Sequence, residues 1–150
     1  MYRLWQLWRA LTGTMTSDDM HFVQTTLTPA EFRLFALLPS YDQRHALDVA
    51  HLLVREGHHS PDLLATALLH DVGKVSDAGQ PLGLGWYGMI VVLQRIPTLY
   101  RWCARWCEPV RRHASHELRS AQRAQQIGAR PAVVALLTDV ARRVDTPAVR

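Results

Sequence analysis

Residues 61–74 read PDLLATALLHDVGK, an apolar run that ends in a histidine, an aspartate and a lysine. Pro61 is typical of a first helical turn and Gly73 of a helix end. The apolar residues between them predict a buried helix with His70 and Asp71 on its last turn. A lone histidine there would be a core residue or a cap, but the adjacent carboxylate favours a ligand that both side chains share.

Capping and helix-breaking residues predict the remaining helices. Thr28 and Glu31 form a capping box around Pro29, and Gly57 is a natural C-terminal stop. The expected helices cover residues 29–38, 42–57, 62–72, 89–110 with a kink at Pro97, 114–127 and 131–146, and residues 76–88 form a loop. No stretch has the alternation of a strand. We therefore expect an all-α fold, a single compact bundle of about six or seven helices.

Length and composition agree with one domain. The chain has 150 residues, of which 48% are hydrophobic, enough for a single core. We expect residues 1–27 to be an N-terminal extension and residues 28–146 to be the core. Residues 1–13, MYRLWQLWRALTG, predict an amphipathic helix that either packs on the core or lies on a membrane surface. No segment reaches the roughly 20 apolar residues that a membrane span needs.

The charges and cysteines narrow the partners and the compartment. The formal charge is +4 with a single lysine, Lys74, and dispersed arginines. A nucleic-acid partner is not expected, because no dense basic block is present. Cys103 and Cys107 lie four residues apart on one predicted helix, where a disulfide would distort the backbone. We expect reduced thiols and a cytoplasmic location.

Two further residues complete a candidate metal site. His45 lies near the start of the helix that precedes His70, and a short loop should make these two helices antiparallel. The start of one then lies beside the end of the other. Asp139 interrupts an apolar helical series near the C-terminus, and a carboxylate on the edge of a buried face needs a cation. His45, His70, Asp71 and Asp139 are thus candidate ligands of one divalent ion.

These residues form an H…HD…D pattern that resembles the HD-domain metal-dependent phosphohydrolases. The most specific part of the likeness is PDLLATALLHDVGK, and DQRHALDVAHLLVREG resembles the first ligand helix of that family. The resemblance implies an HD-type helical bundle and a divalent ion (Mn, Co, Ni, Fe, Mg or Zn) that activates a water. It also implies that Asp71 orients this water and that Lys74 contacts a phosphate oxygen. Arg44 is a weaker candidate for phosphate contact.

Other residues leave alternatives open. Some members of the family hold a second metal through additional histidines, for which His116 is the preferred candidate and His113 the second choice. Both could equally be solvent-exposed on a basic helix. Asp145 is a fallback for the last carboxylate. His58 and His59 are expected to be loop residues, and Trp86, Trp102 and Trp106 either pack between helices or form a lid that stacks a base.

The function expected from these features is hydrolysis of a phosphate ester of a nucleotide or a related small molecule by a metal-activated water. The alternative is a catalytically weak HD scaffold that binds a nucleotide or a metal as a regulatory module. The two differ in turnover, because the ligand residues are the same in both.

Overall fold

The computed structural model describes residues 15–145, so the helix expected within residues 1–13 lies outside the described residues. The described part is all-helical, with nine α-helices, one 3₁₀ turn and no strand, which confirms the predicted class and exceeds the predicted helix number. The helices are α2 (Ser17–Thr26), α3 (Pro29–Phe35), α4 (Ser40–Arg55), α5 (Pro61–Leu69), α6 (Leu84–Leu93), α7 (Pro97–Trp106), α8 (Glu108–Ala114), α9 (His116–Gln126) and α10 (Pro131–Asp145), with the 3₁₀ turn η1 (Val72–Lys74). Across this range no helix has the length and apolar character needed to cross a bilayer.

Local signals set most helix starts as expected. The Thr28 hydroxyl accepts from the Glu31 amide and the Glu31 carboxylate accepts from the Thr28 amide, which confirms the capping box of α3. Thr16 and Asp19 cap α2 in the same way. Gly57 has a φ of 86° just after α4, a conformation that an L side chain rarely adopts.

The long kinked helix expected over residues 89–110 is instead three helices. Pro97 occupies the first turn of α7, where its missing amide hydrogen costs nothing, so it begins a new helix rather than bending an old one. Cys107 is extended, with φ −100° and ψ 113°, and Pro109 lies in the first turn of α8. The expected loop 76–88 is also shorter, because residues from Leu84 onward belong to α6.

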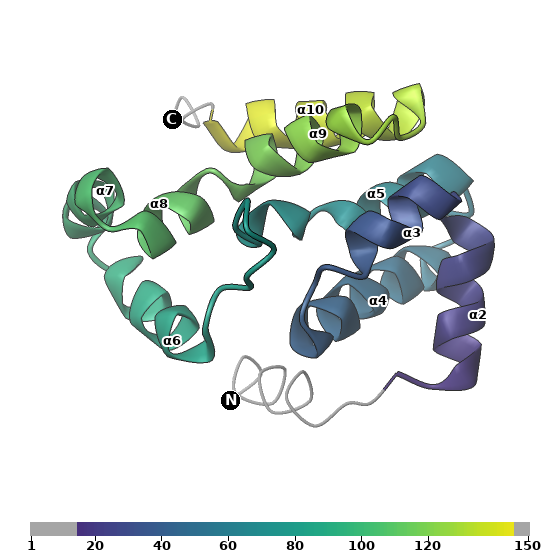
Figure 1. The fold of residues 1–150 in the computed structure, drawn as a ribbon, viewed down its shortest axis with the longest axis horizontal. Helices are drawn as coiled ribbons and strands as arrows, with labels where there is room; N and C mark the ends of the chain where they lie inside the picture. The colour runs from purple at the N-terminus through teal and green to yellow at the C-terminus, as the bar shows by residue number, and fades with distance from the viewer. Residues whose placement is uncertain (1–14, 146–150) are drawn as a thin grey trace.

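The main core surrounds α5, which contacts α2, α3, α4 and α10 (Figure 1). All side chains from Leu64 to Leu69 are buried, as expected for a helix that is apolar on every side. Val23 and Leu27, within the stretch expected to be an N-terminal extension, also belong to this core. Its other large members include Phe35, Leu47, Leu68, Val133 and Leu137.

Helices α6, α7 and α8 form a smaller group, called here the α6–α8 lobe, at the left of Figure 1. Its own buried residues are Leu82, Ile90 and Val110, packed against residues that include Tyr100 and Cys103. Cys103 and Cys107 are free thiols, as predicted. Helix α8 contacts η1, so the lobe meets the main core next to the HD motif.

The end of α5 differs from the prediction in one respect that matters for the site. The helix stops at Leu69, His70 is its C-cap, and Asp71 has φ −100° and ψ 0° before η1 begins. Gly73 is therefore not the helix stop. A Cβ there would lie 2.0 Å from the His116 carbonyl oxygen and 2.8 Å from the Ser120 nitrogen, so glycine is needed because α9 packs directly on it.

Candidate metal centre

Three ligand atoms of His45, His70 and Asp71 lie within 4.8 Å of one another, in a group that could hold a metal ion. The Asp71 Oδ2 atom is 3.9 Å from His45 Nε2 and 3.5 Å from His70 Nε2, and the two imidazole centroids are 5.4 Å apart. His45 comes from the start of α4 and His70 from the end of α5. The predicted juxtaposition of these two helix ends is confirmed.

The tautomer of His70 suits a ligand. Its Nδ1 atom lies 2.8 Å from the Ala67 carbonyl oxygen, which can only accept, so Nδ1 carries the proton in this contact. The other nitrogen, Nε2, then presents a lone pair to the ionised Asp71 carboxylate. Two acceptors that face each other at this distance are stabilised by a cation between them.

His116 presents the same arrangement to the other oxygen of Asp71. Its Nδ1 atom lies 2.6 Å from the His113 carbonyl oxygen, and its Nε2 atom lies 3.4 Å from Asp71 Oδ1. The Asp71 carboxylate thus has His45 and His70 on one oxygen and His116 on the other. His116 is not the solvent-exposed residue of the alternative interpretation, since its side chain is only 13% exposed.

Burial keeps these histidines neutral and Asp71 ionised. Burial lowers the pKa of His45 and of His116 below the ordinary value of 6.5, although Asp71 acts in the opposite direction. Burial would by itself raise the pKa of Asp71, but His70, Lys74 and His116 together hold it well below its usual range. Neutral imidazoles and an ionised carboxylate are the forms that bind metals.

The donor set fits a divalent transition metal. Ligand bonds of about 2.0–2.2 Å place two donors on one ion about 3–4 Å apart, and the two carboxylate–imidazole distances fall in this range. Two imidazoles and a carboxylate suit Mn, Fe, Co, Ni or Zn better than Mg, which prefers oxygen ligands. The side chain of His45 is 49% exposed, so this edge of the group is open to solvent and to a substrate.

Lys74 lies inside the group rather than at its periphery. Its ammonium group donates to Asp71 Oδ2 at 2.6 Å, lies 3.8 Å from Asp42 Oδ1 and sits 5.4 Å from the centroid of the Tyr87 ring. The side chain is 11% exposed. The solvated helix-end cation of the alternative interpretation is therefore excluded, and Lys74 compensates two buried carboxylates.

Asp42 is a site residue that sequence reasoning missed. It lies on α4 three residues before His45, on the same side of the helix, and the Tyr87 hydroxyl donates to its two oxygens at 2.7 and 3.0 Å. Burial, and then the nearby Asp71 charge, raise its pKa to about 6, although Lys74 and Tyr87 lower it. The i, i+3 spacing to His45 was the available signal, and Asp42 was assigned only to the helix start.

The structure does not bring Asp139 to this group. The buried positions of α10 are Val133, Leu137 and Ala141, and Asp139 lies two residues beyond Leu137, about 200° around the helix. Its side chain is exposed, and Val140, which was counted in the buried series, is 39% exposed. The apolar pattern of α10 was thus read with its centre displaced. The side chain of the fallback, Asp145, lies outside the described residues.

Arg44 also has a different role from the one proposed. Its guanidinium donates to Asp19 at 2.8 Å and to Asp48 at 2.8 and 3.1 Å. Together, the two carboxylates hold α2 against α4 and leave the side chain only 10% exposed. Arg44 is a structural link and does not join the metal group.

The remaining histidines separate clearly. His113 is hydrogen-bonded through Nδ1 to the Tyr100 hydroxyl at 3.0 Å, and burial lowers its pKa to about 4. His58 and His59 are exposed loop residues, as predicted. Trp102 and Trp106 are 61% and 75% exposed, so neither packs between helices.

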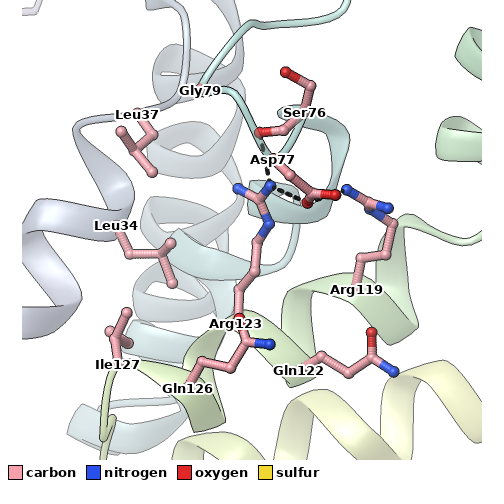
Figure 2. A pocket seen from close by; sticks show the side chains of 10 residues that line it. All are labelled: Leu34, Leu37, Ser76, Asp77, Gly79, Arg119, Gln122, Arg123, Gln126 and Ile127. Atoms are coloured by element: carbon pink, nitrogen blue, oxygen red, sulfur yellow. Dashed lines mark hydrogen bonds and ion pairs between the residues drawn. The ribbon is translucent and has the colours of Figure 1, made fainter.

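A cavity of about 610 Å³ lies on the other side of η1, and none of its lining residues belongs to the metal group (Figure 2). Arg119 and Arg123 of α9 both donate to Asp77 Oδ1, at 2.8 and 3.1 Å. Arg123 also donates to the Ser76 carbonyl oxygen. These contacts fasten the loop that follows η1, and they leave the chemistry with the His45–His70–Asp71 group.

The chain was compared with models of protein families, with curated proteins and with solved structures, and none of the three comparisons found a match. The functional argument consequently rests on the residues of the metal group and on their resemblance to the HD motif.

Proposed function

We propose that this chain is a divalent-metal-dependent phosphohydrolase of HD-domain type, which cleaves a phosphate ester of a nucleotide or another small molecule. One observation carries the proposal: His45, His70 and Asp71 converge on a volume that one ion would fill. The motif resemblance supports it for these three residues. The last aspartate of the motif has no counterpart in the group, because Asp139 is exposed on α10.

The charges around the group favour a phosphorylated ligand once an ion is present. Asp42 and Asp71 with Lys74 leave a net charge of −1 when both carboxylates are ionised, and a divalent ion reverses it to +1. Such an ion would supply a Lewis acid for a phosphoryl oxygen and lower the pKa of a water. Lys74 is placed to stabilise a phosphate oxygen, and Asp42 with Tyr87 holds its ammonium group in position.

Metal binding is tested first, without reference to catalysis. The protein freed of metal with EDTA is titrated with Mn²⁺, Co²⁺, Ni²⁺ and Zn²⁺ by calorimetry, and its thermal unfolding is followed. We expect one tight ion per chain and stabilisation of about 2.7 kcal/mol at a metal concentration 100 times the Kd. His70→Ala and Asp71→Asn should abolish both effects. His59→Ala, an exposed histidine in the loop between α4 and α5, is the control.

Turnover is tested next with p-nitrophenyl phosphate and a panel of nucleoside phosphates. We expect metal-dependent release of inorganic phosphate that falls at least 100-fold in Asp71→Asn. Lys74→Met should weaken activity while metal binding persists. Undiminished turnover in the Asp71 variant, or no ion bound by the wild type, would refute the proposal.

A second function, a metal- or nucleotide-binding module without turnover, is favoured by one observation. The Lys74 ammonium group is 2.6 Å from the same Asp71 oxygen that His45 and His70 face, so an ion must share this oxygen with a resident cation. Tight metal or nucleotide binding with no phosphate released across the panel would support this function over catalysis.

A further inference from the structure

The outer surface of α7 carries exposed aromatic and aliphatic side chains. Leu99, Trp102 and Trp106 are 40%, 61% and 75% exposed, and their i, i+3, i+7 spacing places them on one side of the helix. Val92 and Ile96, just before α7, are 65% and 51% exposed. Contiguous exposed apolar side chains of this size mark an interaction surface.

This surface is not needed by the lobe that presents it. The inner side of α7 carries Tyr100, Cys103 and Ala104, which pack against the buried residues of the α6–α8 lobe. The tryptophans point away from these residues by the same helical spacing. In Figure 1, α7 lies at the left end of the molecule, and its contacts are with α6 and α8 of its own lobe.

The charges on and around this surface are all of one sign. No aspartate or glutamate occurs from Ala78 to Cys107, whereas Arg95, Arg101 and Arg105 are exposed. Arg101 and Arg105 lie four residues apart and so border the tryptophans on one side of the helix. Within residues 15–145, no acidic side chain forms an ion pair with these three arginines.

We propose that α7 lies on the surface of an anionic lipid bilayer and docks the α6–α8 lobe there. Tryptophan rings are most stable at the boundary between headgroups and acyl chains, and arginine pairs with lipid phosphates. A second copy of the chain is a poorer occupant, because a two-fold contact would set the arginines of α7 against each other. This proposal is independent of the metal centre.

The full chain is tested by co-sedimentation with vesicles of phosphatidylcholine alone and with 30% phosphatidylglycerol. We expect binding to the anionic vesicles only, weakened by raising the salt concentration from 50 to 500 mM. Trp102→Ser/Trp106→Ser and Arg101→Gln/Arg105→Gln should each lower the affinity at least tenfold. Leu52→Ser/Arg55→Gln, an exposed leucine and arginine on α4, is the matched control and should bind as the wild type does.

The same preparation excludes the other occupants. Trp5 and Trp8 provide a second test, because Trp5→Ser/Trp8→Ser should leave most of the binding intact. Binding that is lost in this variant but retained in both α7 variants would overturn the proposal. So would a dimer in sedimentation velocity that only the α7 variants dissociate, with no vesicle binding by the wild type. Circular dichroism of each variant confirms that the exposed substitutions leave the helices formed.

Discussion

At the scale of single residues, Gly73 is the position with least tolerance. Its φ is ordinary, and the constraint is space: a Cβ would lie 2.0 Å from the backbone oxygen of His116 and 2.8 Å from the backbone nitrogen of Ser120. Backbone atoms of a packed helix cannot move aside as a flexible side chain can. The glycine of the HDVGK stretch is therefore the contact that lets α9 bring His116 to Asp71.

We expect Gly73→Ala to destabilise the fold by about 2–4 kcal/mol, because α9 must move away from η1. Urea unfolding measures the change. Gly88→Ala is the matched control, since it lies in α6 with open space around it, and the greater helix propensity of alanine should stabilise by about 0.5–1 kcal/mol. Equal effects of the two substitutions would contradict this explanation.

Asp42 predicts an unusual pH dependence. Its pKa is raised by burial from 3.8 to about 6, so between these values the folded state holds a proton that the unfolded chain has released. Its contribution to stability is present in full below pH 3.8 and is lost as the pH rises through 6. The cost of ionising it in the fold is about 3 kcal/mol above pH 6.

Asp42→Asn should therefore be more stable than the wild type by about 1–3 kcal/mol at pH 8, and the difference should vanish near pH 4. Chemical denaturation in EDTA across this pH range provides the measurement. Glu56→Gln, which removes an exposed carboxylate at the end of the same helix, should leave the pH profile of the wild type unchanged. A stabilisation by Asp42→Asn that does not vary with pH would contradict the assignment.

At the scale of elements, the contact between η1 and α9 holds the two halves of the metal group together. Ser120 is fully buried; its hydroxyl accepts from the Gly73 amide at 2.9 Å and donates to the His70 carbonyl oxygen at 2.7 Å. One side chain thus satisfies two backbone groups of the turn that carries Asp71. The position of His116 relative to Asp71 depends on this contact.

Removal of the hydroxyl in Ser120→Ala leaves a buried amide and a buried carbonyl without that partner, and we expect a loss of about 1–3 kcal/mol in unfolding free energy. Metal affinity should fall about 10-fold, as for other residues that orient metal ligands. Ser115→Ala removes an exposed hydroxyl from the residue before α9 and is the control. Unchanged metal affinity in a destabilised Ser120 variant would restrict the role of this contact to stability.

At the scale of the whole molecule, Arg130 joins segments about a hundred residues apart. Its guanidinium donates to both oxygens of Glu31 at 3.0–3.1 Å, to Asp62 at 2.9 Å and to the Thr26 carbonyl oxygen at 3.0 Å. Glu31 has no exposed surface. Burial opposes its ionisation, but Arg130 and the Thr28 amide hold its pKa below the ordinary value.

We expect Arg130→Ala to destabilise the chain by about 3–5 kcal/mol, because it leaves the buried Glu31 carboxylate without its cation. The loss should diminish as the pH falls below 4.5, where Glu31 gains a proton once its partner is gone. Thermal unfolding at pH 7 and pH 4 measures both effects. Arg55→Ala, an exposed arginine at the end of α4, should change stability by less than 0.5 kcal/mol.

How far the fold and the site could be predicted follows from the range of the interactions involved. Capping at Thr28, the stop at Gly57 and the approach of His45 to His70 depend on neighbouring residues or on one short loop. These were predicted correctly. Pro97 was assigned to a kink because its alternative, the first turn of a separate helix, depends on how α6 and α7 pack in their lobe.

The sequence alone determined the all-helical class and the pairing of His45 with His70 and Asp71, because helix periodicity and the direction of two consecutive helices are local properties. Only the tertiary structure decided which distant side chains join them. It turned Asp139 outward, engaged Arg44 with α2, and directed Asp42, Lys74 and His116 to Asp71. The reason is physical: the rotation of a helix about its axis is set by the surfaces against which it packs, and no local pattern encodes those surfaces.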